Sequence, residues 1–107
     1  MRSIYEFNDP VDFMRARKRD LDLSFQEMAD GAGISAKSFF HKVLTRTKTY
    51  TMERVVPIAT VLNIRGKKQL EYFEIMTFLY RAKATPIMRE KILNKFRPPG
   101  MKRKTGI

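Results

Sequence analysis

The stretch from Ser24 to Leu44 constrains the fold of this chain more than any other, because one glycine interrupts a helical pattern of apolar residues there. Ahead of the glycine, apolar side chains recur at spacings of three and four residues, as on the buried face of a helix: Phe25, Met28, Ala29 and Ala32. Gly33 stands where the chain must leave that helix, in a backbone conformation that costs glycine little. The pattern predicts a short helix that ends in a tight turn.

A second short helix is predicted directly after the turn, beyond an apolar plug at Ile34. Ser35 is a suitable N-cap for it, and Phe39 and Val43 supply its apolar face. Small Ala29 lets two helices cross closely near a right angle. The plain alternative is an ordinary helical hairpin within a bundle.

Length and composition indicate one small domain. A chain of 107 residues with 43% apolar content suits one compact unit, which we expect to span residues 1–97 and to be followed by a flexible basic tail, residues 98–107. Cysteine is absent and there is one histidine, so we expect neither a metal nor a cofactor. No apolar run approaches the roughly 20 residues of a membrane span. We expect a cytoplasmic protein, at the nucleoid, without a membrane partner.

The charge favours a polyanionic partner. The chain carries 22 Lys and Arg against 11 Asp and Glu, a net charge of +11. Between Gly31 and Leu70, Glu53 is the only acid among eight bases: Lys37, Lys42, Arg46, Lys48, Arg54, Arg65, Lys67 and Lys68. A charge run is usually a solvated face, but this one coincides with the two predicted short helices.

Two further helices flank this stretch. Asp9 followed by Pro10 is a helix-start signature. The basic residues on the later part of that helix suit contacts with phosphates and a helix C-terminus equally well: Arg15, Arg17, Lys18 and Arg19. Thr51 is the expected cap of a fourth helix, whose apolar members are Val55, Val56, Ile58, Ala59 and Leu62. Pro57 predicts a kink or a late start in it.

The segment Lys67–Lys83 predicts a helix that is apolar nearly all round, and such a helix is buried on more than one side. Leu70, Phe73, Met76 and Tyr80 suffice to attach it to its own domain. Three residues remain and predict a homodimer interface: Ile75, Phe78 and Leu79. If the second short helix binds DNA, a two-fold dimer would place two copies of it at half-sites about one DNA turn, roughly 34–36 Å, apart. The competing prediction is that a last helix, starting at Thr85-Pro86, folds back over them.

The spacing of six residues resembles the helix-turn-helix of DNA-binding proteins of the phage-repressor type: Gln26, Ala29, Gly33, Ile34, Ser35 and Phe39. In that family the second helix enters the major groove of DNA with its N-terminal end toward the bases. We therefore expect an all-α fold, a bundle of five to six helices that contains a phage-repressor-like helix-turn-helix.

Residues 5–96 also resemble the N-terminal domain of a set of paralogous bacterial regulators expanded in Fibrobacter and Bdellovibrio. The most distinctive matches are Glu71-Tyr72-Phe73 and the Phe78…Ala82-Lys83-Ala84-Thr85 segment, beside Ala32-Gly33-Ile34-Ser35. The resemblance implies DNA-binding transcriptional control. Arg46 stands where the family usually has glycine, and Lys42 where it usually has an apolar residue. Relatives continue with a further domain, so this chain either lacks that domain or is a fragment of a longer regulator.

The candidate site residues follow from this interpretation. We expect the DNA bases to be read by five residues: Ala36, Lys37, Ser38, His41 and Lys42. We expect phosphates to be bound by Ser35, Arg46, Lys48 and Thr49. Phe40 either faces DNA or, as we favour, packs onto the loop at Tyr50. The sequence contains no arrangement of paired carboxylates, no Ser-His pair and no phosphate-binding glycine loop, so we do not expect an enzyme. The alternative function is a helical protein–protein interaction module that retains this fold and binds through Lys67–Lys83.

Overall fold

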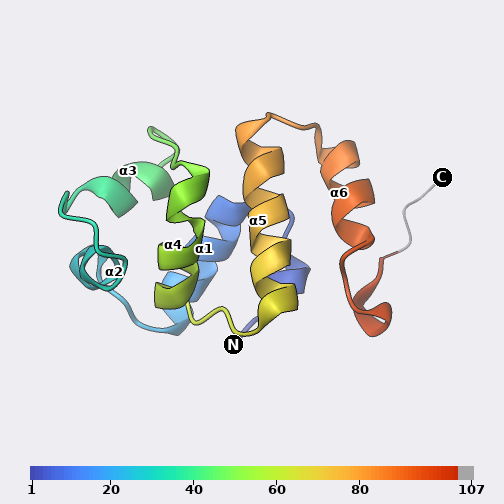
Figure 1. Cartoon of the computed structure of the whole chain (residues 1–107), viewed down its shortest axis with the longest axis horizontal. Coiled ribbons are helices and arrows are strands. Elements are labelled where there is room, and N and C mark those ends of the chain that lie inside the picture. The colour runs from blue at the N-terminus through green and yellow to red at the C-terminus, as the bar shows by residue number, and fades with distance from the viewer. Residues whose placement is uncertain (104–107) are drawn as a thin grey trace.

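The computed structural model describes residues 1–103, and every regular element within them is helical. The prediction of an all-α bundle is therefore confirmed (Figure 1). The α-helices are α1 (Pro10–Asp20), α2 (Phe25–Gly31), α3 (Phe39–Leu44), α4 (Val55–Val61), α5 (Lys67–Arg81) and α6 (Pro86–Asn94). Three 3-10 turns accompany them: η1 (Ile4–Glu6), η2 (Met52–Arg54) and η3 (Pro99–Met101).

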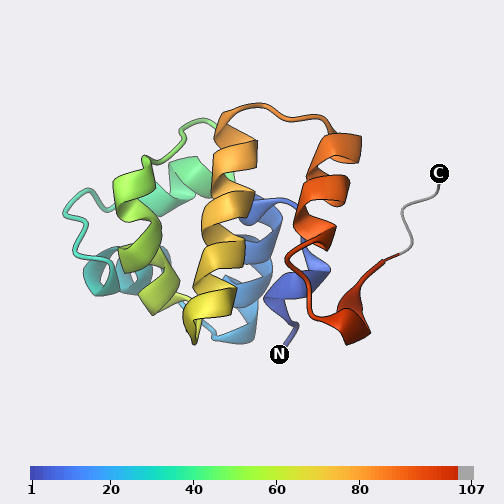
Figure 2. The same cartoon turned by 45° about the vertical axis from the view of Figure 1, so that its right-hand side comes forward.

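The long helix α5 is the centre of the arrangement, because it contacts α1, α4, α6 and η1. The α2–α3 pair lies at one end of the molecule's long axis and α6 at the other, as Figures 1 and 2 show from two sides. Around α5, the largest side chains are fully buried: Phe13, Phe40, Tyr50, Tyr72 and Phe73. The hydroxyls of the two buried tyrosines have hydrogen-bond partners. Tyr72 donates to the Phe7 carbonyl at 2.6 Å, and Tyr50 bonds the Thr77 hydroxyl at 2.7 Å.

Five consecutive helices, α1 to α5, end in the same way, with a residue in the left-handed conformation just past the last turn. These residues are Asp22, Gly33, Arg46, Asn63 and Lys83. At Gly33 (φ 66°), the Gly33 N–H donates to the Asp30 carbonyl and the Ile34 N–H to the Ala29 carbonyl at 2.9 Å. This hydrogen-bond pair satisfies carbonyls that the helix end leaves open. The ending predicted at Gly33 is confirmed, and at the other four helix ends a residue other than glycine takes the same conformation.

The N-terminus of α1 confirms the helix-start signature. The Asp9 side chain accepts hydrogen bonds from the backbone N–H groups of Val11 and Asp12, and Pro10 is the first helical residue. The late start predicted from Pro57 is confirmed too, because η2 precedes α4 and the proline lies in the first turn of α4. Among the apolar members of this helix, Val56 is 55% exposed.

The predicted start of α3 is wrong. Ser35 does not cap it, and α3 begins only at Phe39, after a turn in which the Phe39 N–H donates to the Ala36 carbonyl at 3.1 Å. Ser38 occupies the N-cap position without a side-chain hydrogen bond. Phe39 and Phe40 are both buried, and their anchoring outweighs the modest preference of a serine for an N-cap. The burial of Phe40 agrees with packing inside the protein.

The last helix folds back on α5, as the competing prediction held. Leu79 and Leu93 are buried between these helices and the rest of the domain, so Leu79 is not available for the dimer interface expected from the sequence. Ile75 is half-buried and Phe78 is 60% exposed.

The domain extends past the boundary expected at residue 97. Arg97 is buried and donates to the Tyr5 carbonyl at 3.0 Å, and Arg103 donates to the Glu6 carbonyl at 2.6 Å. These bonds tie the segment after α6 to the N-terminal turn η1. Residues 104–107 of the predicted tail lie outside the described residues.

Candidate nucleic-acid interface

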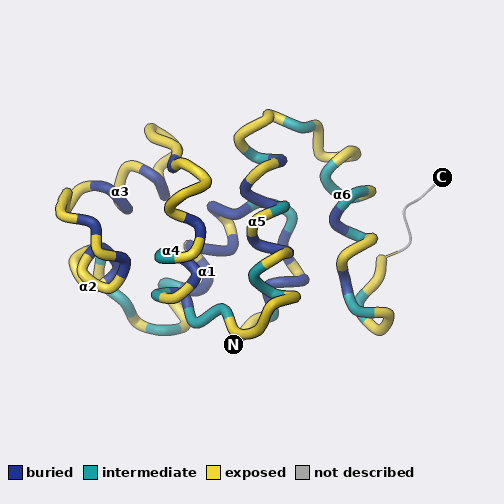
Figure 3. The backbone as a smooth tube through the Cα atoms, viewed as in Figure 1, coloured by how far each residue is buried: buried dark blue, intermediate teal, exposed yellow. Residues whose placement is uncertain are grey.

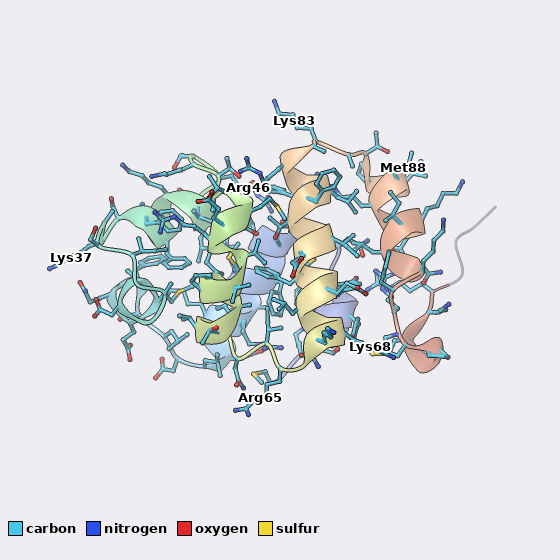
Figure 4. The ribbon with its side chains drawn as sticks, viewed as in Figure 1. Lys37, Arg46, Arg65, Lys68, Lys83 and Met88 are labelled. Carbon is cyan, nitrogen blue, oxygen red and sulfur yellow. The ribbon has the colours of Figure 1, made fainter. Side chains whose placement is uncertain are left out.

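The exposed side of α3 and the turn before it form one polar ridge. The helix buries Phe39, Phe40, Val43 and Leu44, and it leaves His41 and Lys42 exposed. Exposed residues continue along the preceding connection and at the end of the helix: Ser35, Ala36, Lys37, Ser38 and Thr45. Figure 3 shows this exposed stretch at one end of the molecule, and Figure 4 shows Lys37 pointing away from it. We refer to residues 36–45 as the α3 ridge.

The structure thus places the five expected base-reading residues on the α3 ridge, though not all on a helix. Ala36, Lys37 and Ser38 lie in the turn, and only His41 and Lys42 are on α3. The role expected of Ser35 depended on its standing at the helix start. Since α3 begins at Phe39, the Ser35 N–H does not belong to the first turn of the helix.

A groove of about 530 Å³ borders the ridge on its His41 side, between α1, α2 and α3. Its lining carries four charged residues of α1 and the loop that follows: Arg15, Lys18, Arg19 and Asp22. The Lys18 ammonium lies 4.5 Å from the centre of the Phe25 ring, and that ring meets the His41 ring edge to face at 5.5 Å. Phe25 therefore orients groups on both walls of the groove.

The ridge is bordered on its other side by Lys48 and Arg54. The Lys48 ammonium and the Arg54 guanidinium each lie 5.2 Å from the centre of the Phe39 ring, which is itself buried. Cation–π contacts of this kind hold both cations beside α3. Bases thus flank the α3 ridge on both sides. The sequence analysis noted Arg54 among the charges but did not place it in the site.

Arg17, the fourth base of the α1 cluster, is buried. Its guanidinium donates to the backbone carbonyls of Leu62 at 2.7 Å and Arg2 at 3.1 Å. Burial lowers the pKa of Arg17, although the charge of Asp20 partly opposes this shift. Arg17 joins the N-terminus to the end of α4 and does not face solvent, whereas Arg15, Lys18 and Arg19 line the groove.

The guanidinium of Arg46 forms ion pairs within the chain. Its guanidinium donates to the carboxylates of Asp9 and Asp12, each at 3.1 Å, and lies 5.7 Å from the centre of the Tyr80 ring. Its φ of 63° is in the left-handed region, which glycine adopts at less cost. Among the expected phosphate ligands, Lys48 and Thr49 are exposed and form no ion pair within residues 1–103.

The bases between Gly31 and Leu70 do not form one surface. Figure 4 shows Lys37 at the tip of the α2–α3 connection and Arg65 and Lys68 near the start of α5, while Arg46 pairs with Asp9 and Asp12. The bases that accompany α3 come from α1 and from the segment after α3.

Comparison of the chain with protein-family models, with curated proteins and with solved structures gives no match in any of the three. The resemblances to the phage-repressor type and to the bacterial regulators stay predictions.

Among the described residues, no helix is both long enough and apolar enough to cross a membrane.

Proposed function

We propose that this protein binds double-stranded DNA through the α3 ridge and acts in transcriptional control at the nucleoid. The observation that carries the proposal is the polar ridge flanked by bases on both sides, Arg15, Lys18 and Arg19 in the groove and Lys48 and Arg54 beyond Phe39. A helix fits the major groove of B-DNA, which is about 12 Å wide. The resemblance to bacterial regulators supports the regulatory role.

The ridge has the chemistry for contacts with base edges. Lys37 and Lys42 donate hydrogen bonds to acceptors such as guanine O6 and N7, and the Ser38 hydroxyl both donates and accepts. Ala36 offers a methyl group for contact with the methyl group of thymine. His41 is positioned by Phe25 at the edge of the groove, where it reaches either a base or the backbone.

The flanking bases supply sequence-independent affinity. Each phosphate that they neutralise releases condensed counterions, so log K falls with log salt at a slope of about −0.9 per contact. Five such contacts would give a slope of about −4.5. Thr49 adds a hydroxyl donor at the same end of the molecule.

Fluorescence anisotropy with a labelled random duplex at several salt concentrations tests the proposal. The double variant Arg15→Ala, Arg19→Ala should flatten the salt slope by about two units and weaken binding to all sequences. The matched control Arg65→Ala, Lys67→Ala removes the same charge far from α3 and should leave the slope within about half a unit. Equal effects of the two variants, or no binding at low salt, would contradict the proposal and favour an interaction module.

A further inference from the structure

The hairpin formed by α5 and α6 leaves large apolar side chains exposed on one face. Phe78 is 60% exposed, Met88 50% and Phe96 39%, and the half-buried Ile75 and Ile92 complete the set. We name these five residues the hairpin face. Figures 1 and 2 show α5 and α6 side by side in both views, and Figure 4 shows Met88 on the first turn of α6.

Helix geometry brings the five side chains to common levels along the hairpin. Phe78 lies one turn before the end of α5 and Met88 one turn after the start of α6, so the two share a level near the connection. Ile75 and Ile92 lie one turn further along each helix. Phe96 belongs to the far level, because it lines a hollow together with Glu71 of α5.

Within residues 1–103, no further segment covers this apolar surface. The hairpin already buries Leu79 and Leu93, so its core is filled. Of the other exposed large apolar residues, Met52 and Val56 lie on other elements, and Ile87, 72% exposed, lies in the first turn of α6. Single exposed apolar residues are ordinary, whereas a contiguous group marks an interaction site.

Opposite charges border the two sides of the hairpin face. Exposed Glu74 stands on α5 and exposed Lys91 stands on α6, and neither forms an ion pair within residues 1–103. Glu71 and Lys95 do not belong to these borders, because both line the hollow beside Phe96. A face with an acidic border on one side and a basic border on the other is complementary to itself.

We infer that a second copy of this chain covers the hairpin face through a two-fold axis parallel to α5 and α6. That axis lays α5 of one copy along α6 of the other, as an isologous interface requires. A rotation about this axis keeps every residue at its own level along the helices, so residues of equal level meet. The facing helices are antiparallel, because the two helices of one hairpin run in opposite directions (Figure 2). Phe78 then faces Met88 of the second copy, and Glu74 faces Lys91 of the second copy.

The arrangement differs from the dimer expected from the sequence. The α3 ridge lies at the opposite end of the long axis from α6, so this dimer carries its two ridges at its far ends (Figure 1). It would join two DNA segments rather than two half-sites one turn, about 34–36 Å, apart. This consequence rests on the proposed DNA binding, whereas the dimer itself does not.

Sedimentation velocity without DNA tests the dimer. Wild-type protein at roughly 100 µM should associate in a concentration-dependent way, as expected of a small interface with a micromolar Kd. Phe78→Asp and Met88→Asp should each weaken association about tenfold or more, as loss of an interface anchor does. The matched control is Val56→Asp, a residue of α4 that is 55% exposed, and it should change nothing. A monomeric wild type, or equal loss with Val56→Asp, would overturn the inference.

A charge exchange tests the pairing itself and does not depend on apolar substitutions. Glu74→Lys and Lys91→Glu should each impair self-association, because like charges then meet across the two-fold axis. Mixing the two variants should restore association as a heterodimer, since every facing pair is again of opposite sign. A pairing of Glu74 with Lys91 inside one chain predicts no restoration on mixing, and that result would overturn the interface. DNA affinity, measured separately, should be the same for both variants at nanomolar protein.

Discussion

The two ends of this molecule expose different chemistry. The α3 ridge is polar and flanked by bases that are held in place over aromatic rings. The hairpin face is apolar and bordered by charges of both signs. The first arrangement is suited to binding a phosphate backbone, and the second is suited to binding a protein surface. The comparison teaches that the net charge of +11 identifies a partner only after the structure shows which bases are free.

The largest expected effect comes from breaking the attachment of the hairpin end. Arg97 is buried and donates to the Tyr5 carbonyl and to Glu90 at 2.8 Å. Arg97→Met should lower the free energy of unfolding by about 3–5 kcal/mol, because it removes the buried charged partner of the Glu90 carboxylate and the donor to the Tyr5 carbonyl. Urea denaturation measures this change, and a loss below about 1 kcal/mol would show that the bonds do not attach α6.

Acid should loosen the same end before the α3 end. Burial alone would raise the pKa of Glu90, but hydrogen bonds donated by Asn8 and Arg97, with the charge of Arg97, lower it below its ordinary 4.5. A carboxyl whose folded pKa is depressed stabilises the fold above the unfolded pKa, and this contribution is lost as the pH falls through the folded pKa. Stability should therefore decline below about pH 4.5. Amide exchange should rise first in α6, and Glu90→Gln should remove this pH dependence. Equal acid loss with and without the substitution would contradict the assignment.

Much of the fold followed from the sequence because apolar periodicity reports burial. Met28 and Ala29 are buried as their spacing predicts. The pairing of Arg46 with Asp9 and Asp12 was invisible, since 37 and 34 residues separate the partners. The position of Leu79 depended on where α6 lies, which no local pattern contains. In the site, the sequence showed the basic cluster of α1 but could not decide whether it contacts phosphates. Only burial distinguishes Arg17 from the neighbours that line the groove.

The same backbone strain occurs at one helix end in each of the two regions, so its energetic cost can be compared between them. Lys83, after α5, and Arg46, after α3, both have a left-handed φ, 56° and 63°. Lys83→Gly should stabilise the fold by about 0.5–1 kcal/mol, since glycine relieves this strain. Arg46→Gly should gain less, because it also removes two ion pairs with exposed or partly exposed side chains, worth about 0–1 kcal/mol each. Thermal unfolding measures both, and a larger gain at Arg46 would mean that its ion pairs contribute nothing.

The smallest expected effect tests whether the DNA backbone lies in the basic groove. Asp22 lines the groove beside Arg19, where its charge opposes a phosphate. Asp22→Asn keeps a residue that tolerates the left-handed φ of 53° and should raise affinity for random duplex DNA about two- to fivefold at low salt. Glu71→Gln makes the same charge change at the other end of the molecule and should leave affinity nearly unchanged. Unaltered binding by Asp22→Asn would place the DNA backbone outside the groove.

The most direct test of the account is a map of the surface that DNA contacts. Isotope-labelled protein is titrated with a short random duplex at low salt, and the amide chemical shifts are followed by NMR. The account predicts shifts concentrated in residues 36–45 of the α3 ridge and in Arg15–Arg19, with α6 unaffected at concentrations that keep the protein monomeric. Shifts centred on Phe78 and Met88, or no shifts at all, would contradict it.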